Sequence, residues 1–126
     1  MGRMSKPTPT AAELAILQVL WKRGPQTVRA VHEQLDADTG YTTVLKTMQI
    51  MADKGLVARD ESSRSHVYSP LVKAAPTEAK LVGELMQRAF SGSAAKLAIR
   101  ALSTGKPSKE ELAEVRALLD SLEGEE

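Results

Sequence analysis

The chain has 126 residues, of which 42% are apolar, 3% are aromatic and 26% are charged, and its formal net charge is +1. This length allows one domain, or one small domain with an appendage, and the near-neutral charge means that any contact with nucleic acid must be local. The lack of cysteine excludes a disulfide framework, a thiolate metal site and a cysteine nucleophile.

No apolar run reaches the length of a membrane-spanning helix, because Gln18 already interrupts the stretch Leu14–Trp21. The chain begins with a basic segment that contains Arg3 and Lys6 and then runs into prolines instead of an apolar signal region. We therefore expect a soluble cytoplasmic protein without membrane insertion, in which residues 1–9 form an arm.

The first half of the chain predicts three short helices. Thr10 and Glu13 form a capping box, in which each side chain accepts a hydrogen bond from a free backbone amide at a helix start. Gly55 can adopt the left-handed conformation that ends a helix. The helices are predicted over residues 11–23, 28–35 and 41–54, with a short connector at 26–27 and a loop at 36–40. This order is typical of a helix-turn-helix unit whose third helix is in the reading position.

The third predicted helix has two different faces. Val44, Met48 and Met51 repeat at helical spacing and form its apolar face. Hydroxyl, amide and charged side chains occupy the other face, which carries Thr42, Thr43, Lys46, Gln49 and Asp53, with Ile50 among them. Such groups can bind base edges and phosphates, whereas covalent chemistry would need histidine, cysteine or paired carboxylates. Solvation alone is the simpler explanation of a polar face, but an exposed Ile50 favours a bound partner.

After the third predicted helix, the spacing of apolar residues changes from a helical period to a rough alternation. Residues 56–59 and 65–68 are β-prone and roughly alternating, and the polar residues 60–64 between them favour a turn. A hairpin directly after a reading helix makes a winged helix. Its wing would bring Arg59, Arg64 and Ser65 to the DNA backbone or minor groove, and Lys46 and Lys54 would add phosphate contacts. The alternative is a hairpin that only covers the edge of the core.

The second half predicts a hinge at residues 70–76 and three helices over about 76–90, 94–102 and 108–122, the last opened by a Ser108–Glu111 capping box. About fifty residues of helix are marginal as an independent core, which predicts a homodimer through this region. Packing back on the first domain is the alternative. The residues assigned to the dimer interface are Leu81, Leu85, Phe90, Leu97, Leu102, Leu118 and Leu122.

The predicted fold is therefore mainly α with a small β-hairpin. It comprises a winged helix-turn-helix DNA-binding domain over residues 1–70 and a helical dimerisation domain over residues 71–126. Lys and Arg outnumber Asp and Glu by two in residues 1–70, whereas the acids are in excess by one in residues 71–126. The first domain is accordingly the better candidate to contact a polyanion.

Four segments resemble the penicillinase-repressor (BlaI/MecI/CopY) family of bacterial transcriptional regulators, and the resemblance covers nearly the whole chain. They are Tyr41-Thr42-Thr43-Val44, Lys54-Gly55-Leu56-Val57, His66-Val67-Tyr68 and the stretch from Glu13 to Trp21. The resemblance implies a homodimeric repressor on a palindromic operator, with the helix carrying Thr42, Thr43 and Lys46 in the major groove. It also implies relief of repression by proteolysis of the dimerisation region, triggered by a membrane-bound sensor.

The chain departs from that family in two features that bear on induction and in one that bears on DNA binding. The β-lactam-responsive members are cut at an Asn-Phe bond in the fifth helix, whereas this chain has Arg100-Ala101 at the matching position. The copper-responsive members carry paired C-terminal cysteines, which this chain lacks. Gln49 and Ile50 stand where many family members have basic residues, which implies fewer phosphate contacts or a different site preference. The inducing signal, the operator sequence and the regulated genes therefore stay open.

The main function predicted is repression of transcription by a homodimer on operator DNA, without a cofactor. The alternative is a winged helix that contacts a protein and no DNA, because the outer face of the third helix is less basic than a nucleic-acid binder usually shows. An enzyme has no support, since acids, histidines and nucleophiles do not cluster at workable spacing. The isolated His32 and His66 favour structural roles over metal binding. A regulator that releases DNA on binding a small ligand is a third possibility, which the scarcity of aromatics disfavours.

Overall fold

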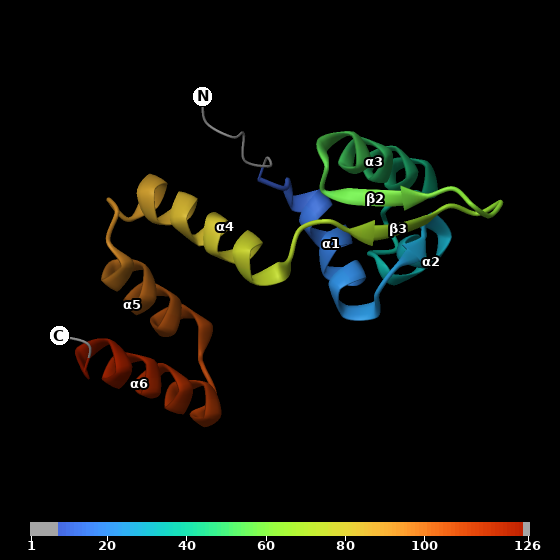
Figure 1. The fold of residues 1–126 in the computed structure, drawn as a ribbon. Helices are drawn as coiled ribbons and strands as arrows, with labels where there is room; N and C mark the ends of the chain where they lie inside the picture. Colours follow the sequence, from blue (N-terminus) through green and yellow to red (C-terminus); the bar gives the residue numbers. More distant parts are fainter. Residues whose placement is uncertain (1–7, 125–126) are drawn as a thin grey trace. The chain divides into compact units, whose positions relative to one another are not determined.

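The computed structural model describes residues 8–124, so the predicted arm residues Arg3 and Lys6 lie outside it (Figure 1). The chain divides into two compact units, Met1–Val82 and Gly83–Glu126. The elements in chain order are α1 (Ala11–Arg23), β1 (Gln26–Thr27), α2 (Val28–Gln34), α3 (Tyr41–Lys54), β2 (Val57–Asp60), β3 (Val67–Pro70), α4 (Ala74–Ala89), α5 (Ala94–Gly105) and α6 (Lys109–Gly124). This is the predicted class, mainly α with a small sheet.

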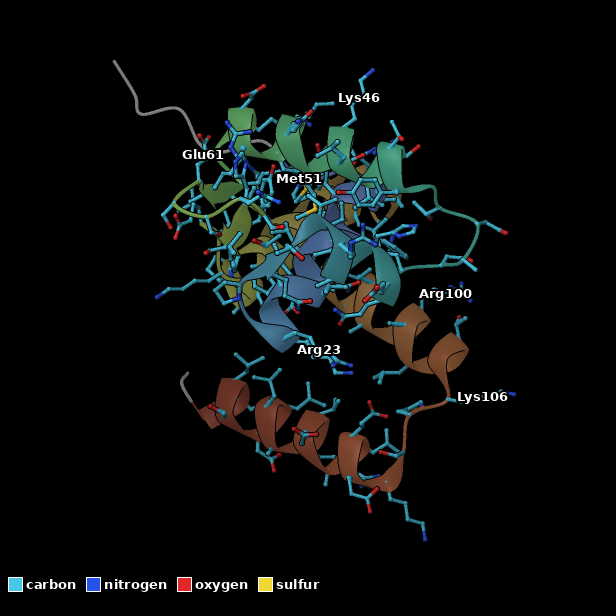
Figure 2. All side chains as sticks on the ribbon, turned by 90° about the vertical axis from the view of Figure 1, so that its right-hand side faces the viewer. Arg23, Lys46, Met51, Glu61, Arg100 and Lys106 are labelled. Atoms are coloured by element: carbon cyan, nitrogen blue, oxygen red, sulfur yellow. The ribbon has the colours of Figure 1, made fainter. Side chains whose placement is uncertain are left out.

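The first unit is a winged helix, in which α1, α2, α3 and the sheet enclose one apolar core. Val44, Met48 and Met51 of α3 are almost completely buried, which confirms the predicted apolar face. Figure 2 shows Met51 inside the domain and Lys46 pointing away from it. The core consists of Ile16, Leu17, Leu20, Val28, Val31, Val44, Met48, Met51, Leu56, Val57 and Tyr68.

The sheet has three antiparallel strands in the order β1-β3-β2. Residues 26–27 were predicted as a connector, which is wrong, because they pair with residues 67–68 of β3. The two wing strands also begin and end one or two residues later than predicted. Asp60 was predicted to open the turn but is the last residue of β2, and its Oδ1 accepts a hydrogen bond from the Ser62 backbone N–H at 2.9 Å. In Figure 1 the β2–β3 connection projects past α2 and α3.

The predicted hinge at residues 70–76 is wrong, because this segment is fixed to the first unit. The indole Nε1 of Trp21 donates a hydrogen bond to the Val72 carbonyl at 2.9 Å, and Val72 packs against the core. α4 then begins at Ala74 and includes Pro76 in its first turn, where a missing N–H leaves no bond unmade. Thr77 is buried, and its hydroxyl donates to the Lys73 carbonyl at 2.7 Å. The first unit therefore extends to Val82, beyond the predicted boundary after residue 70.

Gly55 ends α3 in the left-handed conformation, with φ +82°. We expect Gly55→Ala to lower the free energy of unfolding by about 1 kcal/mol, because a Cβ is strained in that conformation. Urea denaturation followed by circular dichroism measures the change. Gly40→Ala is the control, since Gly40 precedes α3 at φ −75° with open space around its Cβ position. Equal losses of unfolding free energy in Gly55→Ala and Gly40→Ala would contradict the explanation by the left-handed conformation of Gly55.

The second unit comprises the end of α4 together with α5 and α6. Ser108 and Glu111 form the predicted capping box: Oε1 of Glu111 accepts from the Ser108 N–H at 2.9 Å, and the Ser108 hydroxyl accepts from the Glu111 N–H at 3.1 Å. α5 runs to Gly105, past the predicted end at Leu102. Neither α5 nor α6 buries a residue. Within residues 8–124, none of the helices combines the length and the apolarity needed to cross a bilayer.

Candidate nucleic-acid interface

The outer face of α3 presents a continuous polar strip to solvent. Its exposed members are Thr42, Thr43, Lys46, Gln49, Ile50 and the acidic Asp53, which were all predicted for this face. They lie together because they alternate at helical spacing with the buried Val44, Met48 and Met51. Ile50 is 40% exposed, so an apolar side chain stands among hydroxyl, amide and ammonium groups. These groups can contact base edges and thymine methyls.

The start of α3 is held by aromatic packing against α2. The rings of Tyr41 and His32 meet edge to face, with centroids 5.8 Å apart and planes at 87°. Nε2 of His32 lies 2.9 Å from the Thr39 carbonyl in the loop between the helices, and because a carbonyl can only accept, this nitrogen carries the proton. His32 therefore sets the turn of the helix-turn-helix, in agreement with a structural role.

The end of α3 is held by an ion pair with the start of α1. Nζ of Lys54 lies 2.7 Å from Oε2 of Glu13, whose other oxygen accepts from the Thr10 backbone N–H at 2.9 Å. Glu13 is only 3% exposed. Burial alone would raise the pKa of Glu13, but the hydrogen bonds and charge of Lys54 and the hydrogen bonds from Thr10 outweigh it, so the pKa lies below its ordinary value. The predicted phosphate contact Lys54 is thus already paired within the domain.

The wing carries two arginines in different surroundings. Arg59 of β2 hydrogen-bonds the Tyr68 side chain, and its Nε donates to Oε2 of Glu61 at 2.7 Å. These contacts and the charge of Glu61 raise the pKa of Arg59. Arg64 and Ser65 are exposed in the β2–β3 connection, and the Ser65 carbonyl accepts from the Ser63 hydroxyl at 2.9 Å. Arg64 is therefore the wing cation without a carboxylate partner among the described residues.

A cavity of about 410 Å³ lies between α3, the start of α2 and the wing. It brings the predicted residues Gln49, Arg59, Arg64 and Ser65 together and adds Arg29 and Tyr41, which sequence reasoning missed. Thr42, Thr43, Lys46 and Ile50 are exposed on α3 but do not line it, and Lys54 is turned toward Glu13. The signal in the sequence that could have pointed to this site is Arg29, a cation at the start of a predicted helix, where it opposes the helix dipole.

A family model and curated proteins match the sequence of this chain. The family model described as "Penicillinase repressor" matches residues 9–121. Two proteins from Mycobacterium tuberculosis strains, each described as "Transcriptional regulator BlaI", are 47% identical over 62 residues, which cover 47% of this chain and 45% of each relative. The matched part thus spans less than half the length of these curated relatives.

Two solved structures resemble the fold at low sequence identity. An ArsR family transcriptional regulator has a TM-score of 0.45 and 20% identity, covering 67% of this chain and 87% of its own. A transcriptional regulator from Thermotoga maritima has a TM-score of 0.47 and 19% identity, covering 91% of this chain and 74% of its own.

Proposed function

We propose, because this chain belongs to the penicillinase repressor family, that it represses transcription by binding operator DNA as a homodimer. The observation that carries the proposal is the outer face of α3, on which Thr42, Thr43, Lys46, Gln49 and Ile50 are exposed while the opposite face is buried in the core. A helix of this kind fits the major groove, where hydroxyl, amide and ammonium groups read base edges. Bound at a promoter, the protein would exclude the transcription machinery.

The proposed homodimer is supported by the apolar side chains that the second unit leaves in solvent. Ile99 is 65% exposed, Leu118 58% and Leu122 53%, although these are the side chains that usually fill cores. Leu118 and Leu122 belong to the predicted interface, whereas Ile99 does not. Of the other predicted residues, Leu85 is exposed, and Leu81, Phe90, Leu97 and Leu102 are half-buried. A second copy of the same helices would cover this surface. Two reading helices would then meet two half-sites of a palindrome, about one turn of DNA apart.

Relief of repression is proposed to act on the second unit. Any event that separates the two copies makes the half-site contacts independent and weakens binding. Cleavage by a protease, directed by a membrane sensor, is one such event. Arg100 and Ala101 are exposed but lie within α5, so the helix would have to open locally before a protease could bind this bond.

The reading role of α3 is tested by replacing Thr43 and Lys46 with alanine. The double variant is expected to lose about 1–3 kcal/mol of discrimination for each base contact removed. Fragments selected from the parent genome by the wild-type protein supply the operator, and fluorescence anisotropy at two salt concentrations measures affinity.

The matched control replaces Gln18 and Lys22, which are exposed on α1, with alanine. Like the α3 variant, this control loses one lysine charge, but its affinity for the operator should equal that of the wild type. If the α3 variant melts like the wild type and still binds the operator equally well, α3 does not read DNA. If the wild-type protein shows no salt-dependent binding to any fragment, the DNA-binding proposal itself fails.

A further inference from the structure

The cavity between α3 and the wing has the size and lining of a ligand site. Its volume of about 410 Å³ is within the range of small-molecule sites, and it exceeds what a bare phosphate ion needs. Its walls combine three arginines with two tyrosines and with hydroxyl, amide and imidazole groups. The lining residues are Thr27, Val28, Arg29, Tyr41, Leu45, Gln49, Arg59, Arg64, Ser65, His66 and Tyr68.

The charge of this lining is positive and largely uncompensated. In the described part of the chain, no aspartate or glutamate lines the cavity, and the salt bridge of Glu61 is with Arg59. Among the described residues, neither Arg29 nor Arg64 forms a salt bridge. Two guanidinium groups therefore face one space without an internal anion.

Local helix stability does not explain Arg29. It stands in the first turn of α2, where a cation opposes the helix dipole, and this turn contains no acidic residue. Its guanidinium carbon instead lies 5.9 Å from the centroid of the Tyr41 ring. Because Tyr41 is itself fixed against His32, the ring holds this arginine at the cavity wall.

We propose that this cavity binds a phosphate ester, with Arg29 and Arg64 as its charge contacts, the Tyr41 and Ser65 hydroxyls as hydrogen-bond donors, and room for the attached sugar. A guanidinium matches phosphate oxygens in bidentate geometry. The group could come from the backbone of DNA lying along α3, in which case the inference rests on the proposed function. It could also come from a free nucleotide, which would then compete with DNA for the same surface.

The first experiment compares Arg29→Gln and Arg64→Gln with Arg23→Gln. All three remove one positive charge from an exposed side chain, but Arg23 lies at the end of the domain away from Lys46 (Figure 2). If the cavity holds a DNA phosphate, each cavity variant should reduce the magnitude of the slope of log affinity against log salt by about 2, because the proposed homodimer loses one phosphate contact in each copy. Affinity should fall by a similar factor on operator and on unrelated duplex. The Arg23 variant should match the wild type.

The second experiment uses adenosine 5′-monophosphate as the probe at constant ionic strength. If the cavity holds a free nucleotide, the probe should shift the backbone amide resonances of Tyr41, Ser65 and His66 and displace DNA from the wild-type protein. The same titration of the Arg29→Gln variant should show neither effect.

A positive result in either experiment supports the site and identifies the source of the phosphate. Unchanged salt slopes together with no nucleotide-induced shifts would overturn it, even if the wild-type protein binds DNA normally. If the wild-type protein binds no DNA, the proposed function fails, and the nucleotide titration alone then decides on the cavity.

Discussion

Leu118→Asp combined with Leu122→Asp is expected to produce a monomer and to lower operator affinity by about two orders of magnitude or more. Both side chains are more than half exposed on α6, and an aspartate buried between two copies would be an unpaired charge. Each copy would then hold one half-site without the gain in effective concentration that the second contact provides. Sedimentation equilibrium measures the assembly, and anisotropy measures binding to the complete palindrome.

The control for this prediction adds the same two charges to the same helix. Ala117 and Ser121 are also exposed, and each precedes one of the leucines by one position. The variant Ala117→Asp with Ser121→Asp should keep both its assembly and its operator affinity near those of the wild type. The dimer proposal would be wrong if the leucine variant sedimented as a dimer, or if it were a monomer with undiminished affinity.

Lys54→Met is expected to destabilise the first unit by about 2–3 kcal/mol, whereas Glu13→Gln should cost only about 1 kcal/mol. The asymmetry follows from exposure: the side chain of Lys54 is 32% exposed and can turn to water, but that of Glu13 is 4% exposed and would be left as an unpaired carboxylate. In Glu13→Gln, the amide oxygen can still accept from the Thr10 N–H. Urea denaturation at neutral pH measures both changes.

Acid should lower the stability of the wild type more than that of the Lys54→Met variant. In the wild type the pKa of Glu13 is depressed, so the stability that the ionised carboxylate contributes is present above its ordinary value of 4.5 and is lost as the pH falls through the lower, folded-state value. Without the hydrogen bond and the charge of Lys54, the pKa of Glu13 should be higher than in the wild type, so the variant should lose less stability as the pH falls. The difference between wild type and Lys54→Met should therefore shrink near pH 4. A difference independent of pH would contradict the ion-pair explanation.

The elements predicted correctly are those whose signal is local in the sequence. The bounds of α3 follow from an apolar period of one helical turn and a glycine at its end, and the two capping boxes follow from pairs three residues apart. β1 could not be predicted in this way, because two residues carry no period and become a strand only by pairing with β3. The false hinge arose because prolines at 70 and 76 favour irregular structure, whereas contacts of Trp21, distant in sequence, fix that segment.

The candidate site was predicted in part for the same reason. The exposed face of α3 is a matter of helical spacing, so Thr42, Thr43, Lys46, Gln49 and Ile50 were found. The partner of Lys54 lies 41 positions earlier in the chain, so its ion pair could not be predicted from spacing. Arg29 and Tyr41 join the wing arginines only because α2, α3 and β2 converge on one cavity.

The indole hydrogen bond to Val72 gives this protein an optical reporter. Trp21 is the only tryptophan in the chain, so all tryptophan emission comes from the place where the segment before α4 docks on α1. If that segment detaches while the core stays folded, the indole gains water, and its fluorescence should shift to longer wavelength before the circular dichroism signal changes. The protein can thus signal the release of the segment around Val72 from α1 without any added label.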